Sequence, residues 1–309
     1  MSTTSATAVR RGPLGVLRDI LGMIRFSHTL FALPFALAAL VLAWRATGRF
    51  RWPEWAFDVA GIVVCMVLAR STAMAFNRLM DQRFDAANPR TAQRHLPSGR
   101  LSRRAVWIFT ILCALGFIAS TFHFIIHNDN WLPVYLSVPV LVFICAYSLT
   151  KRFTALSHFW LGASLMLAPV ATWLAICGNV TWTPILLGLA VLCWVAGFDI
   201  FYACQDVDFD RKAGLHSVPA WLGVRRSLWL AMFCHLVMLG LLVLLWQVAD
   251  LGWLYLAGVG AAAVLLAYEH WLVRPDDLTR VNTAFFNVNA VISVGLFVVL
   301  AADVLLNSR

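Results

Sequence analysis

Long apolar runs separated by short polar segments dominate this chain. A helix rises about 1.5 Å per residue, so about 20 apolar residues cross the hydrocarbon core of a bilayer. Runs of about that length fall at residues 24–46, 55–76, 104–126, 131–149, 156–177, 182–203, 227–248, 252–273 and 284–306. Asn282, Asn287 and Asn289 dilute the last run near its start. The pattern predicts an all-α integral membrane protein with nine transmembrane helices.

The N-terminal segment differs from the rest of the chain. Residues 1–12 are rich in Ser, Thr, Ala and Arg, which predicts disorder, and they lack the apolar core and cleavage site of a signal peptide. Residues 13–22 have the pattern of an amphipathic lead-in helix. We therefore expect a cytoplasmic N-terminal segment at residues 1–22 and one domain at residues 23–309.

Composition agrees with a membrane protein. Hydrophobic residues make up 61% of the 309 positions and charged residues 13%, whereas a soluble domain carries about 25% charged residues. The seven cysteines are odd in number and scattered, which argues against a disulfide framework or a zinc site. The net charge of +9 resides in loops between apolar runs, a pattern typical of membrane topology. We expect the lipid bilayer, and no nucleic acid, as a partner.

The distribution of Lys and Arg predicts the orientation. With the N-terminus inside, 19 of the 24 Lys and Arg residues fall in inner segments and four in outer segments. Cytoplasmic loops carry the excess of positive residues. The sequence therefore predicts a multi-pass protein of the inner (cytoplasmic) membrane, with its N-terminus and active-site loops in the cytoplasm. Arg70 is the remaining basic residue and lies within a span.

The stretch Gly197–Gly214, on the predicted cytoplasmic side, concentrates acidic residues. It holds four of the fifteen acidic residues of the chain within twelve positions. Side chains three or four residues apart share one face of a helix. The stretch has such a face, made of Asp199, Tyr202, Asp206 and Asp210, whereas Asp208 points away from it. Stacked carboxylates repel one another unless a cation lies among them.

A second acidic stripe lies 125 residues earlier. Asn77, Asp81 and Asp85 are four residues apart, and four predicted spans separate them from the first stripe, so both face the same side. The repeated offset hints at a duplicated four-helix unit followed by a ninth helix. Two facing stripes would make a Mg²⁺ clamp, because Mg²⁺ binds a few carboxylates together with water and phosphate oxygens. The open alternative is a pair of solvated helix ends neutralised by nearby arginines.

These motifs resemble those of the UbiA-type membrane prenyltransferases. The two stripes are similar to the two aspartate-rich signatures of that family. The run Arg70–Asn77, the loop Arg94–Ser102 and the element Tyr147-Ser-Leu-Thr-Lys151-Arg152 resemble the elements around those signatures. The matches follow the family order over about residues 20–300. The resemblance implies a single UbiA-like domain at residues 23–309, with nine transmembrane helices around a central cavity and cytoplasmic cap loops.

The resemblance implies an aromatic prenyltransferase that uses Mg²⁺ to transfer a polyprenyl group from a polyprenyl diphosphate to an aromatic acid. Metal ligands would be Asn77, Asp81, Asp85, Asp206 and Asp210. Lys151, Arg94 and Tyr147 would bind the diphosphate. The catalytic candidates are Asp81, Asp206, Lys151 and Tyr202. Tyr202 would act through its ring face on an allylic cation, or through its hydroxyl on the diphosphate.

The acceptor is expected to meet Arg70, Arg25 and Asp199. Arg70 lies seven residues before Asn77, on the same helix face and about two turns deeper. An arginine within a span is costly, and its fork suits a carboxylate such as that of 4-hydroxybenzoate. The open alternative for Arg70 is a structural ion pair, or a side chain that snorkels to the diphosphate. The open alternative for Arg25 is an interfacial anchor. His28 and His158 are expected to be hydrogen-bonded helix residues.

One departure leaves the acceptor open. Arg78 follows Asn77 where many family members have Asp, and the opening Ile24–Pro34 resembles a branch labelled 4-hydroxybenzoate polyprenyltransferase. Some of that branch is associated with menaquinone made through futalosine rather than with ubiquinone. The acceptor is therefore 4-hydroxybenzoate or another aromatic acid, such as a dihydroxynaphthoate. Haem O, chlorophyll and archaeal ether-lipid prenyl transfer use the same motifs.

Two other classes fit less well. A CDP-alcohol phosphotransferase would carry an Asp-Gly-x-x-Ala-Arg signature, which this chain lacks. A transporter would need polar residues along a path through both leaflets, and the outer halves of the predicted spans are almost uncharged. We therefore expect a membrane-embedded enzyme.

Overall fold

The structure, a computed structural model, describes residues 13–24, 31–50, 52–273, 278 and 287–307. Within these ranges the chain is helical and contains no strand. The helices are α1 (Pro13–Met23), α2 (Leu33–Thr47), α3 (Glu54–Ala87), α4 (Arg103–Thr121), α5 (His123–Asn128), α6 (Leu132–Thr150), α7 (Ser157–Cys177), α8 (Trp182–Ala203), α9 (Val207–Lys212), α10 (Val218–Leu222), α11 (Val224–Val248), α12 (Trp253–Leu272) and α14 (Asn289–Asn307). A 3₁₀ turn, Cys204–Asp206, joins α8 to α9. The predicted all-α membrane fold is confirmed.

Eight helical segments among the described residues are long and apolar enough to cross a membrane. The shorter apolar helix α2, with 15 residues, occupies the place of the first predicted span. The predicted start of that span at residue 24 is wrong, because the helix begins at Leu33, where Pro34 occupies a first-turn position. Proline favours such positions because its fixed φ suits a helix start and its missing N–H has no partner there.

Two other predicted boundaries also change, and a third is untested. Helix α3 has 34 residues and continues to Ala87, well past the predicted end at residue 76, so it carries the whole first stripe. The third predicted span is divided into α4 and α5. The predicted start of the last span at residue 284 lies outside the described residues, and α14 is described from Asn289. The amphipathic lead-in helix is confirmed as α1.

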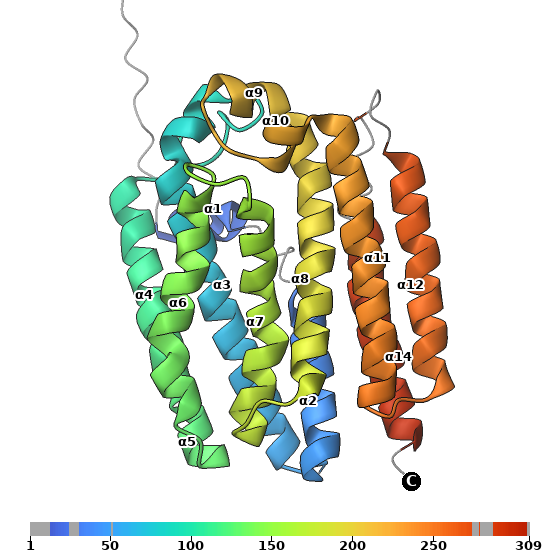
Figure 1. The fold of residues 1–309 in the computed structure, drawn as a ribbon. Helices are drawn as coiled ribbons and strands as arrows, with labels where there is room; N and C mark the ends of the chain where they lie inside the picture. Colours follow the sequence, from blue (N-terminus) through green and yellow to red (C-terminus); the bar gives the residue numbers. More distant parts are fainter. Residues whose placement is uncertain (1–12, 25–30, 51, 274–277, 279–286, 308–309) are drawn as a thin grey trace, which may run out of the picture.

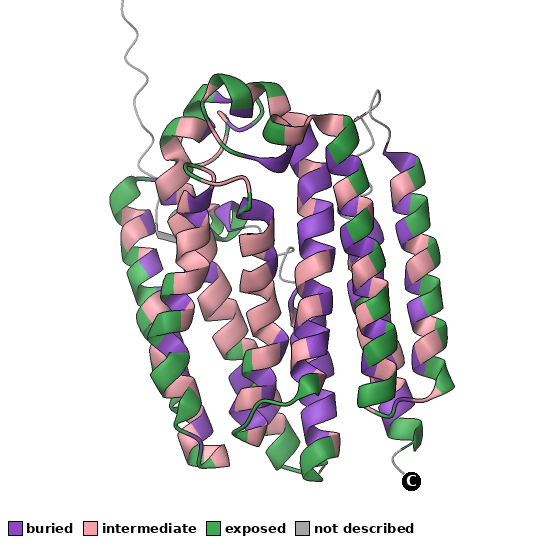
Figure 2. Ribbon diagram, viewed as in Figure 1, coloured by how far each residue is buried: buried purple, intermediate pink, exposed green. Residues whose placement is uncertain are grey.

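Helix α8 forms the centre of the bundle and is buried along most of its length (Figure 2). It packs against α7 and α11, while α2 packs against α7 and α14. Two glycines permit the close approach of α7 and α8. A Cβ atom on Gly162 would lie 2.4 Å from the carbonyl oxygen of Leu192, and one on Gly188 would lie 2.8 Å from the Met166 side chain. Outer helices expose large apolar side chains, as a bilayer requires.

Short elements close one end of this bundle (Figure 1). Helices α9 and α10 lie there, beside the loop of residues 88–102 that joins α3 to α4. Helix α1 packs beneath this loop, where Ile20 and Met23 share a buried apolar cluster with Leu79 and Leu96. The segment that carries residues 199–210 is not one continuous helix, because the 3₁₀ turn Cys204–Asp206 lies between α8 and α9.

Candidate active site

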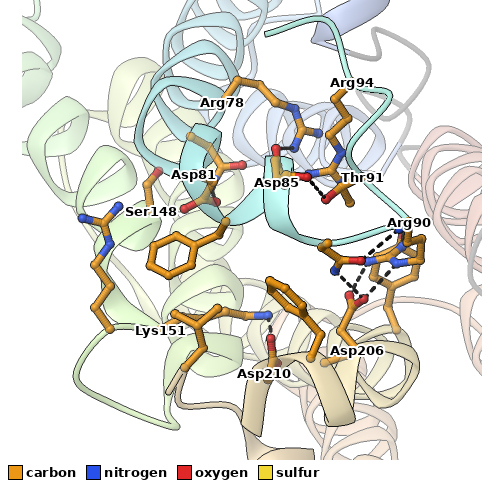
Figure 3. Close-up of a pocket in the computed structure, with 18 of the residues that line it drawn as sticks. Arg78, Asp81, Asp85, Arg90, Thr91, Arg94, Ser148, Lys151, Asp206 and Asp210 are labelled. Atoms are coloured by element: carbon orange, nitrogen blue, oxygen red, sulfur yellow. Dashed lines mark hydrogen bonds and ion pairs between the residues drawn. The ribbon is translucent and has the colours of Figure 1, made fainter. Parts of the chain in front are cut away.

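A polar cavity of about 180 Å³ lies at the capped end of the bundle. The C-terminal parts of α3, α6 and α8 form its walls, and the loop 88–102 and α9 lie across its mouth (Figures 1 and 3). Five carboxylates and five cationic side chains line it, so its charges balance. These are Asp81, Asp85, Asp199, Asp206, Asp210, Arg78, Arg90, Arg94, Lys151 and Arg152.

The first stripe follows the regular spacing of α3. Asn77 donates a hydrogen bond from Nδ2 to Oδ2 of Asp81, one helical turn away, at 2.9 Å. One turn further, Asp85 is buried, and its Oδ1 accepts a hydrogen bond from Arg94 at 2.7 Å. Arg78 lies 3.8 Å from the other oxygen of Asp85. The loop is attached to the same turn, because the Thr91 hydroxyl donates to the Asp85 carbonyl at 3.0 Å.

Arg90, from the loop 88–102, contacts the second stripe across the cavity mouth (Figure 3). Its guanidinium binds both carboxylate oxygens of Asp206, at 2.9 Å from Nε to Oδ1 and through a second, shorter contact to Oδ2. It also donates to the Tyr202 hydroxyl at 2.7 Å, with its Cζ 4.9 Å from the centre of the Tyr202 ring. Asn88 adds a bond of 3.1 Å to Asp206. Burial lowers the pKa of Arg90, but the bonds to Asp206 and Tyr202 outweigh this effect and raise it above its ordinary value.

Two more carboxylates of the second stripe have partners from other elements. Lys151, at the end of α6, lies 3.7 Å from Oδ2 of the buried Asp210 (Figure 3). Deeper in the cavity, Asp199 accepts a hydrogen bond from His158 of α7 at 2.7 Å. Segments far apart in sequence therefore converge on one carboxylate face.

Ten of the twelve predicted site residues line this cavity. They are Asn77, Asp81, Asp85, Arg94, Tyr147, Lys151, Asp199, Tyr202, Asp206 and Asp210. Arg70 is half-buried on α3 but is not among the cavity-lining residues. Arg25 lies outside the described residues, as does His28. Asp208 is exposed, as predicted from its position on the opposite helix face.

Sequence reasoning missed Arg90, Asn88, Arg78, Ser148 and Arg152, which also line the cavity. The Asn88-Pro89 pair offered a signal for the first two, because an Asn-Pro step ends a helix and starts a turn. Such a turn directly after the first stripe returns the next residues over the stripe. Arg152 follows the noted Lys151, and it donates to the Met80 carbonyl at 3.0 Å.

The cavity carboxylates face basic partners in this structure. Among the described residues, no three His, Cys, Asp or Glu side chains are grouped closely enough to hold a metal ion. Arginine and lysine pair with Asp85, Asp206 and Asp210, as the alternative to a metal clamp expects. However, Oδ2 of Asp85 and Oδ2 of Asp210 are buried without a hydrogen-bond donor. These two oxygens retain the capacity to bind a cation.

Comparison with known sequences gives consistent matches. The sequence profile described as the UbiA prenyltransferase family matches residues 32–291. A 4-hydroxybenzoate octaprenyltransferase from Tolumonas auensis is 34% identical over 227 residues, which cover 71% of this chain and 75% of that protein. An enzyme of the same name from Acidovorax ebreus is 31% identical and covers 88% of this chain and 91% of its own length.

Solved structures share the fold. A UbiA homolog from Aeropyrum pernix K1, in its apo form, superposes with a TM-score of 0.77 at 28% identity, covering 91% of this chain and 98% of that chain. A UbiA homolog from Archaeoglobus fulgidus bound to GPP and Mg²⁺ superposes with a TM-score of 0.63 at 20% identity, covering 91% and 99%. The likeness to the second structure concerns the fold.

Proposed function

Since the chain belongs to the UbiA prenyltransferase family, we propose that it transfers a polyprenyl group from a polyprenyl diphosphate to the ring of an aromatic acid. The favoured acceptor is 4-hydroxybenzoate, and the transfer is a step of quinone biosynthesis. The names of the relatives from Tolumonas auensis and Acidovorax ebreus support this acceptor. We also propose that the protein lies in the inner membrane with the capped end in the cytoplasm, because most Lys and Arg residues belong to that end.

The observation that carries the proposal is the paired arrangement of charge in one cavity beside an apolar bundle. Carboxylates of α3 and of the α8–α9 segment share the cavity with Lys151, Arg94 and Arg90. A diphosphate needs such cations, and its accompanying metal needs the carboxylates. Because the cavity charges already balance, a diphosphate and its cation are best accommodated together.

The residues present fit Mg²⁺. Amide and carboxylate oxygens of Asn77, Asp81, Asp85, Asp206 and Asp210 are the hard donors that this ion prefers. Two of the carboxylate oxygens, Oδ2 of Asp85 and Oδ2 of Asp210, are buried without a hydrogen-bond donor, and their cationic neighbours Arg78 and Lys151 lie 3.8 and 3.7 Å away, too far for a hydrogen bond. Bound Mg²⁺ would neutralise the diphosphate and make it a better leaving group. The solved neighbour bound to GPP and Mg²⁺ supports this cofactor.

Side chains of the cavity then bind the leaving group and stabilise the allylic cation. Lys151, Arg94 and Arg90 hold the diphosphate oxygens as the allylic C–O bond breaks and the leaving group departs with the electron pair. One face of the Tyr202 ring lies against the Arg90 guanidinium, and an aromatic ring face can stabilise an allylic cation in the same way. The loop 88–102 and α9 exclude water, which would otherwise capture that cation. The prenyl tail lies among apolar side chains of the bundle.

The test is prenyl transfer in membranes that contain the protein. We expect a prenylated product from 4-hydroxybenzoate and a polyprenyl diphosphate when Mg²⁺ is present, and none after chelation with EDTA. Addition of Mg²⁺ should restore the activity. A panel of aromatic acids that includes a dihydroxynaphthoate tests the acceptor separately. Activity with the panel but not with 4-hydroxybenzoate would reassign the acceptor, and activity in EDTA would contradict the cofactor.

A further inference from the structure

A buried histidine stands behind the deepest carboxylate of the cavity. His158, on α7, is fully buried, whereas the Asp199 side chain is 15% exposed and lines the cavity. Nδ1 of His158 lies 2.7 Å from Oδ2 of Asp199. On the other edge of the ring, Nε2 lies 3.3 Å from the backbone nitrogen of Val218 at the start of α10. The imidazole therefore connects the cavity wall to the cap.

These two contacts fix the proton of the imidazole. The Val218 N–H can only donate, so Nε2 of His158 must be the acceptor. A histidine that accepts at Nε2 is neutral and carries its proton on Nδ1. That proton is donated to Asp199, so Oδ2 of Asp199 is an acceptor and carries no proton. The backbone of α10 thereby sets the tautomer of His158, and this tautomer keeps Oδ2 of Asp199 unprotonated.

Asp199 differs from Asp85, Asp206 and Asp210 in its partner, and it shares a neutral side-chain donor with Asp81, which accepts from the Asn77 amide. Asp85, Asp206 and Asp210 each face an arginine or lysine, and a fixed positive charge makes a carboxylate a poor proton acceptor. Asp199 instead receives a hydrogen bond from a neutral ring. A neutral donor orients the carboxylate without cancelling its charge.

Asp199 also lies at a different depth from the expected metal ligands. Asp199 lies on α8, seven residues before Asp206 of the following 3₁₀ turn, a separation of about 10 Å along a helix. The two stripes match at Asp81 and Asp206 and at Asp85 and Asp210, but the position 125 residues before Asp199 is Met74. Asp199 therefore has no counterpart in the first stripe. It lies on the side of the cavity toward the apolar bundle.

We propose that His158 is a positioning residue that holds Asp199 as the proton acceptor of the transfer reaction. This inference rests on the proposed function. A ring carbon of the acceptor forms the new C–C bond to the allylic carbon, whose bond to the diphosphate has broken with the electron pair leaving on oxygen. The C–H bond at that ring carbon then breaks. Its proton passes to Asp199, its electron pair restores the aromatic ring, and Asp199 later releases the proton to water.

The experiment compares His158→Leu, His158→Gln, Asp199→Asn and the double variant His158→Leu/Asp199→Asn. Leu removes both contacts, whereas the amide of Gln can donate to Asp199 and accept from Val218. Each variant is assayed with normal and ring-deuterated 4-hydroxybenzoate. In the wild-type protein we expect no rate difference between the two acceptors, because proton loss follows the slow bond changes. The control is His235→Gln, which alters another buried histidine, on α11 and bonded to His270 at 3.0 Å.

We expect Asp199→Asn to lower kcat by about 10²–10⁴-fold, the range for loss of a general base. His158→Leu should lower kcat by about 10²-fold, as a small misplacement of a reacting group does. Both variants should show a slower rate with the deuterated acceptor, while KM for the diphosphate stays unchanged. His158→Gln should restore kcat. The double variant should be no slower than Asp199→Asn, because His158 acts through Asp199.

Three results would overturn the inference while leaving the proposed function intact. The first is a wild-type kcat in His158→Leu. The second is a loss of kcat in either single variant without an isotope effect. The third is a double variant in which the two single losses multiply. A general packing defect would affect His235→Gln as well and would raise no isotope effect. A wild-type protein that prenylates no aromatic acid contradicts the proposed function, and the inference with it.

Discussion

The two acidic stripes have matching sequence patterns but are built in different ways. Asn77, Asp81 and Asp85 lie on one unbroken helix, α3. Tyr202, Asp206 and Asp210 occur 125 residues later, where α8 gives way to a 3₁₀ turn and then to α9. A 3₁₀ turn has fewer residues per turn than an α-helix, so the second stripe does not follow one straight helical face.

The stripes also differ in the source of their partners. In the first stripe, Asp81 is bonded by Asn77 of the same helix, one turn away. In the second, Arg90 bonds Asp206 across 116 positions of sequence, and Lys151 reaches Asp210 from the end of α6. The first stripe follows one helix, and the loop 88–102 reaches only its last member, Asp85, through Arg94. The partners of Asp206 and Asp210 in the second stripe come from that loop and from the end of α6. The difference indicates that the cap loops complete the site as well as cover it.

The largest expected effect is the loss of activity in Asp81→Ala and in Asp206→Ala. Each removes a carboxylate from one stripe. If both stripes bind the same Mg²⁺–diphosphate, each variant should lose at least about 10²–10³-fold in kcat, which is the loss typical of one electrostatic contact to a transition state. The measurement is prenyl transfer at saturating Mg²⁺ and diphosphate. Wild-type activity in either variant would show that its stripe holds no essential ligand.

Asp208 supplies the matched control. It lies two residues after Asp206 but is exposed on the opposite side of the segment. Asp208→Ala removes the same charge from the adjoining helix α9 and should leave kcat unchanged. Loss of activity in this variant would mean that the whole segment, rather than its cavity face, is sensitive to charge.

Sequence alone predicts the first stripe better than the second for a physical reason. Apolar length and helical spacing depend on neighbouring residues, so nine helical positions, the α3 face and the exposed Asp208 could be predicted. The contact of Arg90 with Asp206 depends on the path of a loop, and that of His158 with Asp199 on the alignment of α7 with α8. Neither follows from spacing. The 3₁₀ turn at Cys204–Asp206 likewise has no Pro or Gly to announce it.

A smaller and more specific effect is expected from Arg90→Gln, because Arg90 competes with a cation for Asp206. Without its charge, Asp206 should bind Mg²⁺ more readily, so the Mg²⁺ concentration for half-maximal rate should fall. The diphosphate loses a charge-assisted hydrogen bond of about 1.5–3 kcal/mol, so its KM should rise by about 10–100-fold. The measurement is a Mg²⁺ titration at several diphosphate concentrations.

Arg83→Gln is the control for that prediction. Arg83 is exposed on α3 and does not line the cavity, so its replacement removes one positive charge from the same end of the bundle. Neither the half-maximal Mg²⁺ concentration nor KM for the diphosphate should change in this control. Parallel rises of both constants in Arg90→Gln would indicate that Arg90 maintains the loop rather than competing with the metal.

The smallest expected effect concerns the deep end of the first stripe, where Arg70 lies seven residues before Asn77. Its Nε is buried without a hydrogen-bond acceptor, as expected of a side chain that awaits an anionic ligand. If Arg70 binds the acceptor carboxylate, Arg70→Gln should raise KM for 4-hydroxybenzoate by about tenfold, the value of one charged hydrogen bond, and leave KM for the diphosphate unchanged. With 4-hydroxybenzamide, which has no carboxylate, wild type and Arg70→Gln should perform alike. A rise in KM for the diphosphate instead would assign Arg70 to the leaving group. In that case α3 would contact only the diphosphate, and Asp199 of α8 would remain the residue that contacts the acceptor deeper in the cavity.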